Sequence, residues 1–422
     1  MTTLSSTYQY AFFLGSHPAL SANEAMGVLE QQGYAPQITD VAPEYLIVTL
    51  QADLPKDFLN RLGGTIRIAR VIGQQTDPWL GDQIWSHLEI SGNTKLSVGI
   101  SSLRLPPREV RDVANELKAR AKEYGVKMRF VVSHGKYAML NAAQVLSNDL
   151  LIAPNQEIVL LQTKVGYLLL RSTHMQHIGA YELRDIKRPV RDARVGMLPP
   201  KLAQIMLNLA VSHRAAALQP ATLSTPTILD PFSGLGTILQ EGWLMGYTMH
   251  GSDSNPRLVE AAKKNVQWVM QQFPSPLEMP RVRNHDVTEP FPPTWSQTYD
   301  AIVTEPFLGR PLHSPLTGKK AQEYLGKLAD LYYTFFRHAH GVLKPHGIIL
   351  IVFPAIRQQW RGDTFALLPP DFLDAIRKLG YIPKQLSRQE LASLAEATPR
   401  HSLLYSRPDA LIGRELTVWE KQ

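Results

Sequence analysis

Residues 228–237 of the chain read ILDPFSGLGT, and they give the strongest indication of the fold. A short apolar strand ends in Asp230, a turn containing Gly234 and Gly236 follows, and Thr237 begins a helix. Glycines in such a turn let the backbone approach a ligand closely and adopt dihedral angles that other residues avoid. A strand, a glycine-rich turn and a helix in this order indicate a site for a nucleotide-like ligand in an α/β domain.

Strand-like and helix-like segments alternate on the carboxyl side of this stretch. This alternation predicts a mostly parallel sheet with helices on both faces. Ligands of such sheets bind beyond the carboxyl ends of the strands. We expect helices near 237–246, 256–271 and 319–342, and strands at 227–230, 248–253, 281–286, 299–305 and 347–354.

Two further acidic residues follow strands of this predicted sheet. Asp253 ends the second strand, at the distance from the glycine turn where an acid binds ribose hydroxyls. Asp286 ends the third and suits an adenine amine. Taken singly, Asp253 could instead cap the next helix, in competition with Asn255, and Asp286 could be a turn residue. Three acids at three successive strand ends favour a common ligand.

Residues 300–309 read DAIVTEPFLG. This segment predicts a strand that places Glu305, Pro306 and Phe307 at the carboxyl edge of the same sheet. An ordinary exit from a strand into a loop would also contain proline and glycine. The functional interpretation is a corner that binds an amine. A carboxylate and a backbone carbonyl accept hydrogen bonds from the amine, proline fixes the backbone, and the aromatic ring stacks on a base. Positioning then does most of the catalysis.

The residues before this domain are predicted to form two smaller α/β units. In the first, residues 1–64, we expect strands at 10–15 and 44–50 and a helix over 21–32 that begins with a capping box of Ser21 and Glu24. The second covers residues 65–185, and the third domain, residues 186–422, includes a leading linker and helix. In the second unit we expect a helix over 107–124 and strands at 94–102, 127–133 and 157–163.

Positive charge is concentrated in two segments of this basic chain, whose net charge is +7. Residues 95–136 contain ten Lys and Arg against four acids, and residues 184–201 contain six against two. Concentrated positive charge favours a polyphosphate partner, although a charge run is also typical of a solvated helix face. The candidate RNA-binding residues are Arg104, Arg108, Arg111, Lys118, Arg188 and Arg191.

The composition excludes several kinds of site and function. The chain has no cysteine, which removes disulfides, thiolate zinc sites and cysteine nucleophiles of the kind used to methylate carbon 5 of pyrimidines. The histidines show no ligand spacing, so no metal is expected. No apolar stretch is long enough for a membrane span and the first residues lack a secretory leader, so we expect a cytoplasmic protein.

The motifs DPFSGLGT (230–237), GSDSNP (251–256) and DAIVTEPFLG (300–309), in this order and spacing, resemble S-adenosylmethionine-dependent methyltransferases that act on amines. Residues 188–210 resemble the linker and helix of one branch, the THUMP-domain tRNA guanine-N2 methyltransferase family, whose members modify guanosine 10. Segments 140–150 and 401–416 are similar as well. The resemblance implies an α/β fold in which ferredoxin-like and THUMP-like RNA-binding domains precede a Rossmann-like class I methyltransferase domain.

The resemblance also implies roles for individual residues and a cofactor, S-adenosyl-L-methionine. Asp253 would hold the ribose and Asp286 the adenine, while Glu305, Pro306 and Phe307 would form the target corner. The family's corner is Asp or Asn, then Pro, Pro, an aromatic residue and Gly, whereas this chain has Glu, Pro, Phe, Leu and Gly. The methionine side of the pocket would be formed by Asp230, Phe232, Gly234, Gly236 and Thr237.

Three functions are compatible with these features. The leading hypothesis is a methyltransferase that modifies the exocyclic N2 amine of a guanosine in tRNA, or in another structured RNA. A DNA methyltransferase acting on adenine or cytosine amines would use the same corner, but no target-recognition domain is visible. The third is a non-catalytic RNA-binding protein that retains the cofactor pocket, motivated by the altered corner.

Overall fold

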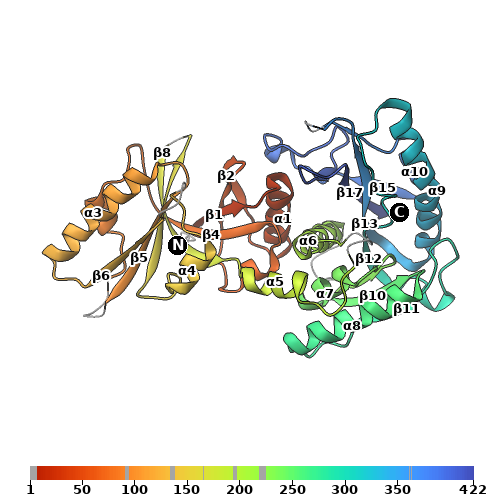
Figure 1. The fold of residues 1–422 in the computed structure, drawn as a ribbon, viewed down its shortest axis with the longest axis horizontal. Coiled ribbons are helices and arrows are strands. Elements are labelled where there is room, and N and C mark those ends of the chain that lie inside the picture. The colour runs from red at the N-terminus through yellow and green to blue at the C-terminus, as the bar shows by residue number, and fades with distance from the viewer. Residues whose placement is uncertain are drawn as a thin grey trace, which may run out of the picture. The chain divides into compact units, whose positions relative to one another are not determined.

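The structure is a computed structural model of the chain and describes residues 7–90, 95–133, 138–164, 166–192, 197–217, 225–360, 362 and 364–422. It divides into two compact units (Figure 1). Within the described ranges, no helix is both long and apolar enough to pass through a membrane. Unit 1 comprises Met1–Gly15, Tyr34–Asn60 and Thr65–Ile178, and unit 2 comprises Ser16–Gly33, Arg61–Gly64 and Gly179–Gln422.

Unit 1 is built on one eight-stranded sheet. Strand β5 is parallel to its neighbours β6 and β7, and the other pairs are antiparallel. Its helices are α2 (Gly81–Trp85), α3 (Pro107–Glu123) and α4 (Ala142–Ser147). The strand order is β2 (Gln37–Ala42), β3 (Tyr45–Leu50), β1 (Tyr8–Leu14), β4 (Thr65–Gln75), β8 (Gly166–Met175), β7 (Gln156–Thr163), β5 (Leu96–Ser102) and β6 (Met128–Val132).

The sequence correctly predicted β1, β3, β5, β6, β7 and α3 within one or two residues. It did not predict β2, β4 or β8. Since β4 and β8 lie at the centre of the sheet, strands from both sides of residue 64 contribute to one sheet. The division of residues 1–185 into two domains stays a prediction.

Helix α1 (Pro18–Gln31) belongs to unit 2, where it packs against α6 (Pro200–Ala217). The predicted capping box is wrong, because the helix begins three residues earlier with proline in its first turn, a favoured position. The Ser21 hydroxyl donates to the backbone oxygen of His17 (2.9 Å). Glu24 is fully buried and accepts the backbone N–H groups that follow η1 (Phe58–Arg61), at residues 63 and 64.

Unit 2 is built on a nine-stranded sheet whose first five strands are parallel, as predicted. Strands β17 and β15 extend it in antiparallel pairs that the sequence did not predict. The order is β11 (Arg281–Asn284), β10 (Thr248–Asp253), β9 (Thr227–Asp230), β12 (Tyr299–Thr304), β13 (Leu343–Arg357), β17 (Ile412–Lys421) and β15 (Tyr381–Lys384), with β14 (Phe365–Ala366) on β13 and β16 (Leu403–Tyr405) on β17.

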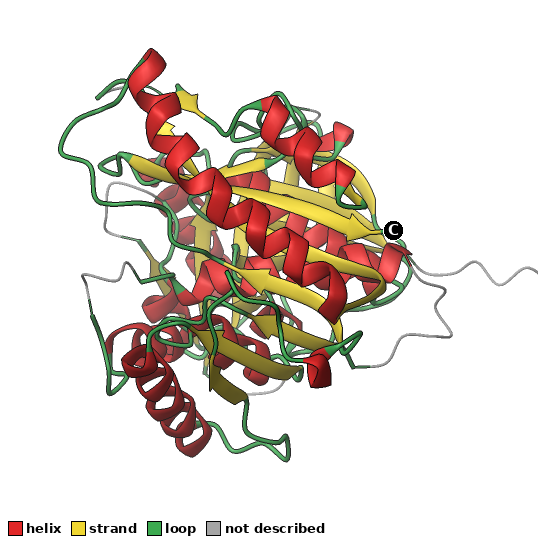
Figure 2. Cartoon of the chain, turned by 90° about the vertical axis from the view of Figure 1, so that its right-hand side faces the viewer, coloured by secondary structure: helices red, strands yellow, loops and turns green. Residues whose placement is uncertain are grey.

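The remaining helices of unit 2 connect and cover these strands. Figure 2 shows the long helix α9 lying across the sheet. The helices α7, α8 and α9 match the predicted positions within two residues. Their bounds are α5 (Ile178–Ile186), α7 (Thr237–Leu244), α8 (Pro256–Gln272), α9 (Gly318–Val342) and α10 (Pro370–Lys378), with short turns η3 (Pro293–Trp295) and η4 (Gln389–Leu391).

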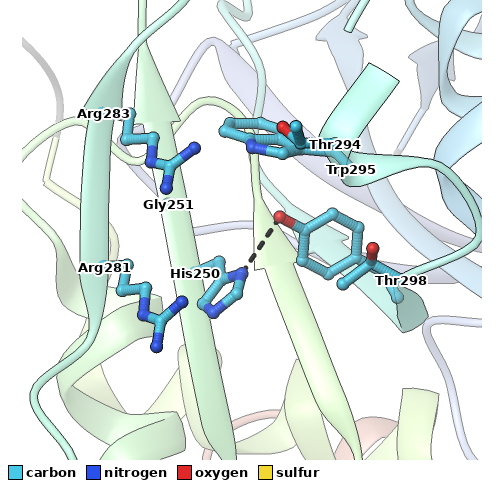
Figure 3. A pocket seen from close by; sticks show the side chains of 8 residues that line it. His250, Gly251, Arg281, Arg283, Thr294, Trp295 and Thr298 are labelled. Atoms are coloured by element: carbon cyan, nitrogen blue, oxygen red, sulfur yellow. Dashed lines mark hydrogen bonds between the residues drawn. The ribbon is translucent and has the colours of Figure 1, made fainter. Parts of the chain in front are cut away.

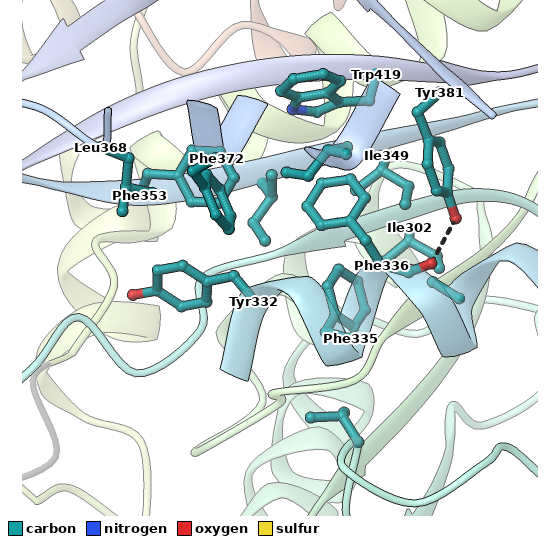
Figure 4. Packing of buried hydrophobic residues seen from close by; sticks show 14 of the residues in the cluster. Ile302, Tyr332, Phe335, Phe336, Ile349, Phe353, Leu368, Phe372, Tyr381 and Trp419 are labelled. Atoms are coloured by element: carbon teal, nitrogen blue, oxygen red, sulfur yellow. Dashed lines mark hydrogen bonds between the residues drawn. The ribbon is translucent and has the colours of Figure 1, made fainter. Parts of the chain in front are cut away.

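The core of unit 2 is aromatic and lies between α9 and the sheet. Tyr332, Phe335 and Phe336 of α9 are fully buried, and Figure 4 shows them facing side chains of the sheet. The Tyr332 ring centroid is 5.4 Å from that of Phe353, and the Phe336 centroid is 5.7 Å from that of Trp419. These aromatic residues therefore hold the helix on the strands that position the site, and they are not available to stack on a base.

Candidate functional site

A cavity of about 720 Å³ lies at the carboxyl edge of the parallel strands of unit 2. Strands β9, β10, β11 and β12 all end at this edge because they run in the same direction. The four acidic residues predicted to share a site, Asp230, Asp253, Asp286 and Glu305, all line the cavity. The fold therefore brings these four acidic residues together at one edge of the sheet.

Asp230 is the most deeply placed of these acids, with 2% of its surface exposed. Its Oδ1 accepts hydrogen bonds from the Thr304 hydroxyl (2.7 Å) and from the backbone N–H of Phe232 (3.3 Å). Burial raises the pKa of Asp230 to about 7, the two hydrogen bonds oppose this shift, and the nearby charges of Asp253 and Glu305 add to it. The cavity thus has at its base a carboxyl group that titrates near neutral pH.

The glycine turn forms an open wall of the cavity. Gly234 has φ +50°, and a Cβ built there would meet only the backbone oxygen of Phe232, at 3.9 Å, so the space above the turn is free for a ligand. Gly236 has φ +81° and precedes α7, and a Cβ there would lie 3.2 Å from that of Ala262 in α8. The two glycines therefore serve different purposes, ligand approach at one and close helix packing at the other.

Asp253 is held by backbone N–H groups on both of its oxygens. Oδ2 accepts from Gly234 (2.9 Å) and Oδ1 from Asn255 (2.9 Å). Asn255, not Asp253, caps α8, because its side chain accepts the N–H of Arg257 (3.0 Å). The Asp253 carboxylate is therefore not used to cap the helix. It lies at the cavity wall, in contact with the glycine turn.

Asp286 follows β11 and is exposed at the cavity mouth. Its Oδ1 accepts from the backbone N–H (2.9 Å) and the hydroxyl (2.8 Å) of Thr288, and these bonds lower the pKa of Asp286. Beside it, Nε2 of His285 is buried without a hydrogen-bond partner among the described residues, as is Oγ of Ser233. Both of these residues line the cavity, so its walls offer polar groups that a ligand can satisfy.

Glu305, Pro306 and Phe307 follow β12 and form the opposite side of the cavity. Arg414 of β17 binds the Glu305 carboxylate with two groups, Nε to Oε2 and Nη2 to Oε1 (3.0 Å). Pro306 is buried, whereas Phe307 is 56% exposed, and its backbone oxygen accepts the Tyr332 hydroxyl (2.7 Å). The corner therefore presents an acidic group, a fixed backbone and an accessible ring.

Known proteins share this sequence and fold to different degrees. No known protein-family profile matches the chain. The chain is 25% identical over 339 residues to a tRNA (guanine(10)-N2)-dimethyltransferase of Methanothermobacter thermautotrophicus, a match that covers 80% of this chain and 86% of the relative. It is 30% identical over 176 residues, 41% of each chain, to a protein of the same name from Pyrococcus abyssi.

The crystal structure of TrmN from Thermus thermophilus matches 99% of this chain and 100% of its own, with a TM-score of 0.50 and 15% sequence identity. The two chains share a fold. The chain is accordingly an α/β protein whose second unit is built on a Rossmann-like sheet with five parallel strands.

Most of the candidate RNA-binding residues are exposed, with one exception. Arg188 is 3% exposed, its Nη1 donates to the Thr237 hydroxyl (2.8 Å) and its Nη2 to the sulfur of Met197 (3.1 Å). Arg188 is therefore a buried residue that binds the first residue of α7. A buried guanidinium cannot reach a phosphate, so its assignment as an RNA contact is wrong. The exposed candidates are Arg104, Arg108, Arg111 and Lys118 in unit 1 and Arg191 in unit 2.

Sequence reasoning missed two residues at the site, Arg414 and Tyr332. Arg414 lies 109 residues after Glu305, on an antiparallel strand that the sequence did not predict, so no local pattern linked the two. Tyr332 packs in the core, and its hydroxyl also fixes the backbone of the corner. The contact between Arg414 and Glu305 becomes visible only in the structure, where β17 pairs with β13.

Proposed function

We propose that the chain is an S-adenosylmethionine-dependent methyltransferase that modifies the exocyclic N2 amine of a guanosine in tRNA. The observation that carries the proposal is the convergence of Asp230, Asp253, Asp286 and Glu305 on one cavity. The names of the two curated relatives, both tRNA (guanine(10)-N2)-dimethyltransferases, supply the target.

The cavity fits the cofactor by its chemistry and its space. The carboxylate of Asp253 suits ribose hydroxyls, and Asp286 suits the adenine amine. On the methionine side we place Asp230 and the open turn at Gly234, with Phe232, Gly236 and Thr237 supporting that turn. Ser233 and His285 offer polar atoms that have no partner among the described residues. Bound S-adenosylmethionine supplies a methyl group on a positively charged sulfur, which an amine lone pair can attack.

The corner at Glu305 positions the target amine. A guanine amine is a weak nucleophile because its lone pair is delocalised into the ring, and hydrogen bonds from the amine to two acceptors favour a pyramidal nitrogen. We assign the Glu305 carboxylate and the Pro306 carbonyl as these acceptors, since the Phe307 oxygen is bonded to Tyr332. The exposed Phe307 ring stacks on the base. Arg414 keeps the Glu305 carboxylate in one orientation.

The RNA is held by unit 1 in this proposal, and residues 65–185 form a THUMP-like domain. On α3, Arg108, Arg111 and Lys118 are three and seven residues apart, so they lie on one face. The opposite face, which includes Val110 and Leu117, is buried. A line of exposed cations along one helix face is an electrostatic footprint suited to a phosphate backbone.

Methyl transfer to unmodified tRNA tests the proposal. With isotope-labelled cofactor, the wild-type chain is expected to produce 2-methylguanosine, detected by mass spectrometry of the digested RNA. Glu305→Gln should reduce kcat on the order of 100-fold, because it removes the negative charge beside the amine, while cofactor affinity stays unchanged. Glu323→Gln, a change of the same kind at an exposed position on α9, is the control. Cofactor binding without any methylated guanosine would contradict the proposal.

The contact between Glu305 and Arg414 favours one competing function, a non-catalytic RNA-binding protein, because both carboxylate oxygens already have a partner. The two proposals differ in turnover. Methyl transfer to RNA that is abolished in Glu305→Ala excludes the non-catalytic alternative. Competition between duplex DNA and tRNA for binding separates the RNA enzyme from a DNA amine methyltransferase.

A further inference from the structure

Unit 2 contains a second cavity, of about 280 Å³, at the edge of its sheet (Figure 3). It lies between the edge strand β11 and the segment that leads through η3 into β12. None of its lining residues lines the first cavity. The lining residues are His250, Gly251, Arg281, Arg283, Thr294, Trp295, Thr298 and Tyr299.

The strand geometry gathers three basic side chains in this cavity. Arg281 and Arg283 are two residues apart on β11, so they project from the same face of the sheet, while Val282 between them is buried on the other face. His250 on β10 is the register partner of Arg281. Strand β11 is an edge strand, with only β10 beside it among the described residues.

The lining is positively charged without compensation. Two guanidinium groups line the cavity, and none of its described lining residues is acidic. Glu278 approaches Arg281 at 3.4 Å from outside the cavity, but both side chains are mostly exposed, so this pair is weak. Arg283 lies over the ring of the buried Trp295, at 5.6 Å from its centroid, which holds the guanidinium in place without neutralising it.

The neutral groups of the cavity are polar. Burial and the charges of Arg281 and Arg283 lower the pKa of His250, and burial raises the pKa of Tyr299. The Tyr299 hydroxyl therefore keeps its proton, and it forms a hydrogen bond with Nδ1 of His250 (3.0 Å). Both groups are thus polar and uncharged.

We propose that this second cavity binds a phosphate group. Guanidinium groups match phosphate geometry with paired N–H donors, and the hydroxyls of Thr294 and Thr298 add further donors. A phosphodiester of a bound RNA and a free phosphorylated compound offer the same chemistry. The proposal does not depend on methyl transfer, since it follows from the residues of this cavity alone.

The first arm of the test is calorimetric titration with inorganic pyrophosphate. The wild-type chain should bind it, and the double variant R281A/R283A should bind roughly tenfold more weakly or worse, because two charge-assisted donors are removed. Arg337→Ala removes one charge from an exposed position on α9 that lines neither cavity, and should bind as the wild type does. Unchanged affinity for S-adenosylhomocysteine in all variants shows that unit 2 remains folded.

The second arm measures tRNA affinity against salt concentration. Each phosphate that the protein no longer neutralises lowers the slope of log affinity against log salt by roughly 0.7 to 0.9. If the ligand is an RNA phosphate, the double variant should neutralise at least one phosphate fewer than the wild type, whereas R337A should show the wild-type slope. If pyrophosphate binding falls while the slope is unchanged, the phosphate belongs to a free compound. Equal pyrophosphate affinity and equal slope in the wild type and the double variant overturn the proposal.

Discussion

Asp230 should make cofactor affinity depend on pH. The ammonium group of the cofactor's methionine moiety pairs, in our account, with the ionised Asp230 carboxylate. Because the pKa of Asp230 is raised to about 7, this carboxyl is protonated below neutral pH and must lose its proton before it can bind the ammonium. Affinity is therefore expected to be constant well above pH 7 and to fall as pH decreases through that value.

The magnitude follows from the distance between the working pH and the pKa. One pH unit corresponds to about 1.4 kcal/mol, so at about pH 5.5, roughly 1.5 units below the pKa of Asp230, binding should weaken by about 2 kcal/mol, or roughly 30-fold. The Asp286 carboxyl does not titrate in this window, because its pKa is lowered. The pKa of His285 is lowered as well, because burial disfavours the charged imidazolium.

Calorimetric titration with S-adenosylhomocysteine between about pH 5.5 and 8.5 measures this dependence. Asp230→Asn keeps the shape of the side chain and an acceptor for Thr304, but cannot ionise. This variant should bind roughly 10- to 100-fold more weakly at the alkaline end and show no dependence on Asp230 ionisation. A flat wild-type profile, or the same slope in Asp230→Asn, would refute the assignment.

Three further predictions concern other residues of unit 2. Gly234→Val and Gly246→Val both place a branched residue at positive φ and should each destabilise the chain by about 1–2 kcal/mol, but calorimetry should show weaker cofactor binding only for Gly234→Val, whose side chain enters the cavity. Arg184→Met leaves the buried Glu241 unpaired and should lower the free energy of unfolding in urea by about 3–5 kcal/mol; a double variant with Glu241→Leu that is no more stable than the single one would contradict this. Phe307→Ala should raise KM for tRNA about tenfold by removing a stacking surface, and an unchanged KM would show that the exposed ring does not contact the base.

Local patterns predicted the part of the site that lies directly after the strands. Asp230 and Asp253 end strands and Glu305 follows one, and the apolar run and turn of each strand can be recognised from neighbouring residues. Parallel pairing then places these residues at one edge, so a one-dimensional pattern was sufficient to predict a three-dimensional cluster.

Contacts between distant segments were not predictable in this way. Arg414 reaches Glu305 only because β17 pairs with β13, and nothing near residue 414 indicates an acidic partner. Arg188 was grouped with exposed arginines because a run of charges does not distinguish a buried guanidinium from a solvated one. Glu24 looked like half of a capping box, yet it accepts hydrogen bonds from residues 63 and 64, far along the chain. These outcomes depend on tertiary packing, which overrides local preference.

The crystal structure of the chain with bound S-adenosylhomocysteine would test the central idea most directly. We predict that the ligand occupies the larger cavity of unit 2, with its ribose hydroxyls on Asp253, its adenine beside Asp286 and its amino-acid end near Asp230. Glu305 should then face the sulfur atom across free space. A ligand bound elsewhere, or one that engages none of these carboxylates, would contradict the account.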